Sequence, residues 1–269
     1  RAASLYRERA RRPDAAAIAL IAARSVLPDD RELTRQVADL LQEMGRAADA
    51  AEFDALLLET DPFQEPLFTR HRAFLAETGD SQALAALMMR RAQRQPPRDA
   101  AESYLAAARA FREGGALERA LLCEDQAFEL APASTEAFHL LRARAGSDVR
   151  RQAELLALRS AAVPSEQAVP LLRERAQLLL KAGEVLLAAQ AFDDFLEHAA
   201  DDVEALATRA DLAAEGGGPS AAWPYDRRLL AAGGDALPVP VRVRTHLRLG
   251  HASLASGAHQ DAAQAFETV

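Results

Sequence analysis

The sequence predicts an all-α fold built from antiparallel helix pairs, and three observations predict it. Alanine and leucine dominate the composition, while isoleucine occurs only at Ile18 and Ile21, which favours helices because strands prefer β-branched residues. Glycines recur at intervals of 34 residues, or close to that, which is the period of a two-helix repeat. Prolines recur in the same phase, where helices are expected to end. A sheet-centred fold is nearly excluded.

The composition also narrows the classes of function. The chain has 32 Lys and Arg against 40 Asp and Glu, a net charge of −8, whereas a nucleic-acid binder needs an excess of clustered cations. One cysteine, Cys123, rules out an internal disulfide framework and a cysteine metal site. The longest apolar run, from Ala15 to Ala23, is far shorter than the roughly 20 residues that span a bilayer. We therefore expect neither a nucleic-acid partner nor membrane insertion.

The repeat divides the chain into successive helix pairs. The expected turn glycines are Gly45, Gly79, Gly115, Gly183, Gly217 and Gly257, and the prolines that close a pair are Pro28, Pro62, Pro96 and Pro132. Two helices of about 14 residues and two short turns fill each period. The resulting eight motifs are residues 1–30, 31–64, 65–100, 101–134, 135–168, 169–202, 203–242 and 243–269.

The segment 101–132 shows the pattern most fully. Its large residues are Tyr104 and Phe111, its turn glycine is Gly115, its small residues are Ala108, Ala120 and Ala127, and Pro132 closes it. This arrangement resembles a tetratricopeptide repeat, and segments 31–62, 169–200 and 243–269 resemble it nearly as well. The resemblance covers the whole chain as about eight motifs. It implies one right-handed α-α superhelix over residues 1–269, with a concave groove lined by the first helix of each pair.

The other motifs depart from the pattern. The third has a bulky Arg72 where a small residue is expected, and in the fifth Gly146 and Asp148 are expected to make the turn. The seventh is six residues longer than the period, and we place its insertion at Gly216–Tyr225. There Pro224 interrupts the second helix, and Leu237–Val241 is expected to form an extended linker. Either the insertion is a binding edge that exposes Trp223, the only tryptophan, or Trp223 fills a gap in an irregular repeat.

The family resemblance places partner contacts on the outward positions of the first helices. The candidate residues are Arg109, Arg112, Glu113, His139, Arg173, Gln177 and Lys181. Their cations could pair with an acidic segment, because arginine offers a planar fork of donors to carboxylates. The alternative is an ordinary solvated face, since Glu102, Glu136 and Glu174 lie among them. Some family members clamp a C-terminal carboxylate with asparagine, but this sequence contains no asparagine, so a chaperone-tail receptor is not expected.

No pattern in the sequence indicates catalysis. The six histidines show no metal-ligand spacing, and there is no phosphate-binding loop or nucleophile motif. We expect no metal, no cofactor and no enzymatic activity. Cys123 is expected to be a small packed residue in a second helix. The sequence begins inside a first helix and lacks an initiator methionine, so we interpret it as part of a longer protein, for which the cytoplasm is favoured and the periplasm stays open.

The leading functional hypothesis is a scaffold that binds a peptide or protein partner in the groove. One alternative is a regulatory or substrate-docking arm of a larger enzyme or sensor. Another is a bacterial cell-envelope assembly factor for secretion or pili. A single lysine among many arginines, with abundant alanine, is typical of a GC-rich bacterial genome.

Overall fold

The fold is that of a computed structural model, in which residues 12–269 are described. The chain forms two compact units, the first ending at Ala131 and the second comprising Pro132–Val269. We call them unit 1 and unit 2 and describe each by itself. The helix expected at the start of the first motif lies outside the described residues. That motif's second helix is present as α2 (Pro13–Val26).

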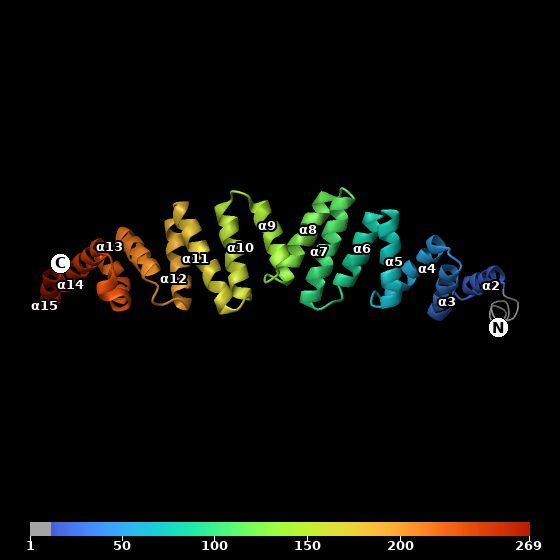
Figure 1. Cartoon of the computed structure of the whole chain (residues 1–269), viewed down its shortest axis with the longest axis horizontal. Coiled ribbons are helices and arrows are strands. Elements are labelled where there is room, and N and C mark those ends of the chain that lie inside the picture. The colour runs from blue at the N-terminus through green and yellow to red at the C-terminus, as the bar shows by residue number, and fades with distance from the viewer. Residues whose placement is uncertain (1–11) are drawn as a thin grey trace. The chain divides into compact units, whose positions relative to one another are not determined.

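Unit 1 is a series of helices in which each packs against the next (Figure 1). After α2 come α3 (Arg31–Glu43), α4 (Ala47–Thr60), α5 (Glu65–Thr78), α6 (Ser81–Ala92), α7 (Pro97–Glu113) and α8 (Leu117–Leu130). The first helices of the pairs are α3, α5 and α7, and the second helices are α4, α6 and α8. The described residues of unit 1 contain no strand, which confirms the predicted fold class.

Unit 2 continues the same order of elements. Its helices are α9 (Thr135–Ala145), α10 (Val149–Ala162), α11 (Ser165–Lys181), α12 (Val185–His198), α13 (Val203–Gly233), α14 (Val239–Ala255) and α15 (His259–Glu267). A short 3-10 helix, Gly234–Ala236, connects α13 to α14. Three first helices, α7, α11 and α14, begin four residues before the motif start expected from the sequence. The division of residues 1–269 into eight motifs of one superhelix stays a prediction.

The turns between the helices of a pair follow the predicted glycines. Five of the six expected positions adopt a positive φ, namely Gly45, Gly79, Gly115, Gly183 and Gly257. In the fifth motif Gly146 also has a positive φ and Asp148 accepts a hydrogen bond from the backbone N–H of Arg151, so the turn expected there is confirmed. The sixth position was wrong by one residue, because the positive φ is at Gly218 and not at Gly217.

Small residues lie where neighbouring helices cross. Ala108, Ala120 and Ala127 are all buried, as predicted, and Cys123 packs in one apolar cluster with Ala108 and Ala120. A methyl group at these places lets the two backbones approach, while larger side chains such as Phe111 fill the remaining space. Burial raises the pKa of the Cys123 thiol. The alanines and the aromatic residue that the repeat pattern singled out in this motif are therefore part of its interior, beside buried leucines.

The third motif keeps the expected phase at the buried Phe68 and at the turn glycine Gly79, and departs from it only at Arg72. Arg72 is exposed, and the buried side chain of α5 at this level is His71. Burial lowers the pKa of His71 below its ordinary 6.5, and among the described residues its Nδ1 has no hydrogen-bond partner. The arginine therefore breaks no packing rule, because the position that required a small or apolar residue belongs to its neighbour.

The seventh motif has a kink, although not the insertion expected at its glycine run. Gly218 interrupts α13 with φ 74° and ψ −174°, and Pro219 begins the second half of the helix. Pro224 lies inside that half, as predicted. The expected extended linker was wrong from Val239 onward, because α14 begins there and a proline in the first turn of a helix is compatible with it. Leu237 is extended and buried.

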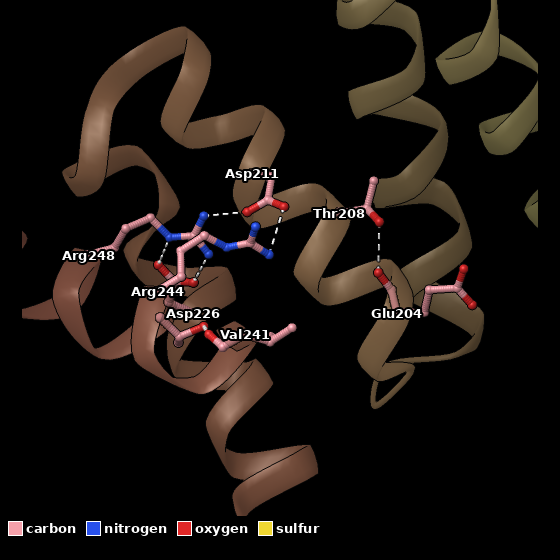
Figure 2. A network of polar contacts seen from close by, with 8 residues as sticks. Glu204, Thr208, Asp211, Asp226, Val241, Arg244 and Arg248 are labelled. Carbon is pink, nitrogen blue, oxygen red and sulfur yellow. Dashed lines mark hydrogen bonds and ion pairs between the residues drawn. The ribbon is translucent and has the colours of Figure 1, made fainter. Parts of the chain in front are cut away.

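The same group of three charged residues joins two helix pairs in each unit. In unit 1, Arg70 of α5 donates to both carboxylate oxygens of Asp54 in α4, with Nε at 2.7 Å, and to Asp39 of α3 at 2.9 Å. In unit 2, Arg248 of α14 donates to both oxygens of Asp226 in α13, with Nε at 2.9 Å, and to Asp211 (Figure 2). We call each group a joint triad.

The residue spacings within the two joint triads also show where the extra residues of the seventh motif lie. In both triads the second aspartate follows the first by 15 residues, so the glycine run between Asp211 and Asp226 adds none. The arginine follows the second aspartate by 16 residues in unit 1 and by 22 in unit 2. The six extra residues therefore lie after Asp226, and four of them form an additional first turn of α14.

Both arginines are held in their charged form. Hydrogen bonding to Asp54 raises the pKa of Arg70 above its ordinary value. Burial lowers the pKa of Arg248, but the hydrogen bonds to Asp226 and Asp211 outweigh that effect and the pKa is raised. Burial also raises the pKa of the Asp226 carboxyl, against the opposing hydrogen bonds from Arg248. The triads pair buried charges between successive helix pairs, so we assign them to folding and not to a ligand site.

Candidate protein-binding surfaces

Three of the sequence-predicted residues lie on α7 in unit 1. Arg109, Arg112 and Glu113 are all exposed near the end of this helix. The guanidinium of Arg112 is engaged by Glu124 of α8, with its Nε 2.8 Å from Oε1, and Glu124 is buried. Among the described residues Oε2 of Glu124 has no hydrogen-bond partner. The guanidinium of Arg112 therefore connects α7 to α8 and is already paired within the protein.

The other four lie in unit 2. His139 of α9 is exposed and makes an edge-on contact with the ring of Phe138, with 5.8 Å between ring centroids. Arg173, Gln177 and Lys181 follow one another at four-residue intervals along α11, so they share one face of the helix. Lys181 is exposed at the last position of α11. The seven candidates are therefore divided between the two units.

Arg173 and Gln177 line one small pocket in unit 2. Its volume is about 60 Å³, and Phe195 of α12 and Thr208 of α13 also line it. The guanidinium of Arg173 lies 5.0 Å from the centroid of the Phe195 ring and is paired with Asp202. The pocket is too small for more than one short side chain, so it is a contact point and not a complete site.

Sequence analysis missed a larger cleft on the first helices of unit 1. It has a volume of about 480 Å³ and is lined by α5, α6 and α7. Its charged side chains are Glu65, Arg72, Arg91, Asp99 and Glu102. Arg91 is paired with Glu65 and stacks on Phe68 with 4.1 Å to the ring centroid, whereas no ion pair is found for Arg72 within the described part of the chain. The unexpected Arg72 was the signal in the sequence that could have identified this cleft.

Trp223 lines a third cleft, formed by α13, α14 and α15 in unit 2. Its volume is about 410 Å³. The indole is 40% exposed, and the guanidinium of Arg227 lies 4.9 Å from its ring centroid. Trp223 thus fills part of the space between helices and still presents an open face. The structure combines elements of the two interpretations left open by the sequence.

The described residues hold neither a metal-binding cluster nor a helix that could span a membrane. No group of three or more His, Cys, Asp or Glu side chains within residues 12–269 is arranged to hold a metal ion. None of the described helices has the length and apolar character needed to cross a bilayer.

Comparisons with known proteins find likeness at the level of the fold. No protein-family model matches the chain, and no curated protein matches it. Among solved structures, the C-terminal part of a TPR repeat-containing protein from Cytophaga hutchinsonii is 12% identical, covering 86% of this chain and 92% of that chain, with a TM-score of 0.37. The type IV pilus biogenesis factor PilW is 14% identical, covering 88% and 90%, with a TM-score of 0.31.

A tetratricopeptide repeat protein from Parabacteroides merdae is 14% identical, covering 99% of this chain and 88% of that chain, with a TM-score of 0.30. Because these TM-scores are low, the conclusion about the fold rests on the helices of this chain. Helix pairs, positive-φ turn glycines close to the 34-residue period and buried alanines in fixed places all occur in the described residues. The chain is an all-α array of tetratricopeptide-like helix pairs.

Proposed function

We propose that this chain is a protein-interaction scaffold whose first-helix faces bind a peptide or protein partner. The observation that carries the proposal is the cleft on α5, α6 and α7, which is open, about 480 Å³ in volume and lined by side chains of both charge signs. A preformed cleft between rigid helices binds without an ordering cost in the scaffold, so a few anchor contacts suffice for affinity.

The charges of this cleft favour an extended segment with charges of both signs. Arg72 offers a guanidinium to a carboxylate of the partner, and Asp99 and Glu102 offer carboxylates to a cation. A purely acidic partner is less well matched, because Arg112 and Arg173 are already paired within the protein. In unit 2 the face of α11 that holds Arg173, Gln177 and Lys181 is a separate candidate contact surface.

Charge reversal on the first-helix faces tests the proposal. Arg72→Glu and Lys181→Glu break no ion pair found within residues 12–269, so both variants should fold normally by circular dichroism. Each would be used as bait, beside the wild type, in affinity capture from cells of the source organism. The matched control is Glu59→Arg, which reverses an exposed charge on a second helix, α4, away from the clefts described here.

We expect the wild type and Glu59→Arg to retain a common partner that one or both groove variants lose. Identical capture by all four proteins would refute a first-helix site. Testing the two reversals separately identifies the unit that makes the contact. The same surface would serve a docking arm of a larger enzyme or an envelope assembly factor, and the identity of the captured partner separates these roles.

A further inference from the structure

A second cleft lies in unit 1 between two second helices. Its volume is about 450 Å³, and its walls are α6 and α8. Tyr104 and Phe111 of α7 contribute aromatic surface, Met89 lines it from α6, and Leu122 and Cys123 line it from α8. The cleft on the first helices is lined by α5 and a different set of α7 residues, so the two clefts share no lining residue.

The exposed apolar side chains of unit 1 gather on the second helices. Every large apolar side chain that is exposed on a described helix of this unit lies on α2, α4 or α8, and none lies on α3, α5 or α7. These residues are Ile18, Ile21, Val26, Leu56, Leu117, Leu122 and Leu130. Leu122 is 65% exposed at the edge of the cleft. Apolar surface beside an apolar cleft is characteristic of an interaction site.

The cleft contains one charged side chain. Arg119 of α8 lines it, with its guanidinium 5.8 Å from the centroid of the Phe111 ring. No ion pair is found for Arg119 among residues 12–269, whereas Arg112, the second-last residue of α7, is paired with Glu124. A guanidinium at an apolar surface gains most from a carboxylate, because charge-assisted hydrogen bonds strengthen as water is excluded.

We propose that the cleft between α6 and α8 is a second docking site, and that its occupant is an amphipathic helix of a partner protein. Apolar side chains one and two turns apart would enter the cleft against Met89, Tyr104 and Leu122, and one acidic residue at the edge would pair with Arg119. An apolar cleft between two helices suits a third helix, whose side chains at i, i+4 and i+7 form a narrow apolar stripe. This site is independent of the first-helix surface proposed above.

A peptide selection tests the chemistry of the occupant. Display libraries of helix-forming peptides of about 16 residues, roughly 24 Å of helix, would be selected on the full chain. The probe for later measurements is the synthetic form of the most enriched peptide. We expect enriched sequences to share leucine, isoleucine or methionine at helical spacing and one Asp or Glu in a fixed place.

Two variants and two matched controls locate the site. Leu122→Ser and Arg119→Ala should each weaken the selected peptide about tenfold or more, because each removes an anchor contact worth at least about 1.4 kcal/mol. Leu117→Ser, an equally apolar exposed position of α8 outside the cleft, and Arg72→Glu, in the other cleft, should leave the affinity unchanged. The bound peptide should also slow the reaction of Cys123 with a thiol reagent several-fold.

Three results would overturn the proposal. The first is selection of no related sequences, or of a consensus without the acidic residue. The second is retention of affinity in both Leu122→Ser and Arg119→Ala. The third is sedimentation evidence that this surface is covered by a second copy of the chain in a dimer that Leu122→Ser dissociates. None of these results depends on whether the first-helix surface binds its own partner.

Discussion

The joint between α4 and α5 and the joint between α13 and α14 use the same three residue types and differ in how deeply they are buried. The side chain of Arg70 is 22% exposed and that of Arg248 is 11% exposed, while Asp54 and Asp226 are both fully buried. The outer aspartate is 48% exposed in unit 1 and 34% exposed in unit 2, where Arg244 also pairs with it at 3.0 Å. The two joint triads contain the same residue types, so the difference in burial should decide how much each contributes to the free energy of unfolding.

The two joints also show which features are the same in both units and which ones vary. The seventh motif contains a kink, two prolines within the helix and six extra residues, yet Asp211, Asp226 and Arg248 meet as their counterparts do in unit 1. The contacts between pairs are thus preserved while the connecting backbone varies. The following predictions test this comparison in order of decreasing expected effect.

The largest effect should come from removing the arginine. Arg248→Met leaves the carboxylate of Asp226 buried without a cation and should lower the free energy of unfolding by about 3–5 kcal/mol. Arg70→Met should cost less, about 2–3 kcal/mol, because water reaches its site more readily. Urea titration of each variant measures both values. The double variant Asp226→Leu/Arg248→Met should recover most of the loss, and a larger cost in unit 1 would reverse the proposed order.

The second-largest effect should come from replacing a turn glycine, and its size should differ between Gly218 and Gly79. At Gly218 the pair φ 74° and ψ −174° is accessible almost only to glycine, so Gly218→Ala should cost about 2–3 kcal/mol. Gly79 has φ 71° and ψ 18°, the left-handed region that other residues enter at less cost, so Gly79→Ala should cost about 1 kcal/mol. An added Cβ meets nothing within 4 Å at either position, so the difference isolates backbone strain. Equal thermal shifts would show that α13 relaxes around its kink.

The outer aspartates should contribute modestly. Asp211→Asn weakens contacts with Arg244 and Arg248 and should cost about 1 kcal/mol, whereas Asp39→Asn should cost about 0.5 kcal/mol or less at its more exposed site. Repeating both measurements in high salt provides the control. The contribution of Asp39 should nearly vanish there, while that of Asp211 should persist.

The smallest effect should be the pH dependence that His71 contributes in unit 1. His71 follows Arg70, and the residue that follows Arg248 is Leu249. Because burial lowers the folded-state pKa of His71, protonation favours the unfolded chain, and its contribution to stability is lost as pH falls from about 6.5 toward that lower pKa. His71→Leu should therefore lose less stability than the wild type between about pH 7.5 and 5.5. An identical loss in both proteins would mean that His71 is solvated.

The sequence predicted the features of this fold that repeat. Buried alanines and turn glycines recur because each helix pair meets the same packing requirement, so their spacing is visible without coordinates. The joint triads were not predicted, since Asp39, Asp54 and Arg70 belong to three helices and ordinary surface helices contain the same residue types. The exact position of the kink was also missed, because Gly216, Gly217 and Gly218 are chemically identical and packing selects one of them.

The candidate site was predicted less completely than the fold. Arg173 and Gln177 do meet in one pocket, because a spacing of four residues places side chains on the same helix face. The resemblance could not show that Arg112 is engaged by Glu124, which depends on how α7 and α8 pack. It also directed attention to the first helices, so the apolar cleft between α6 and α8 had no counterpart in the sequence analysis.

Lys181 is the only lysine of the chain, and it lies exposed at the end of α11, just before the turn at Gly183. A protease specific for lysine therefore has one cleavage point, between the two helices of a pair. Cleavage there requires the end of α11 to unwind, so the digestion rate reports how often this single turn opens in the intact protein. Because the chain has a single lysine, the rate of cleavage by such a protease measures local unfolding in unit 2 without any engineered label.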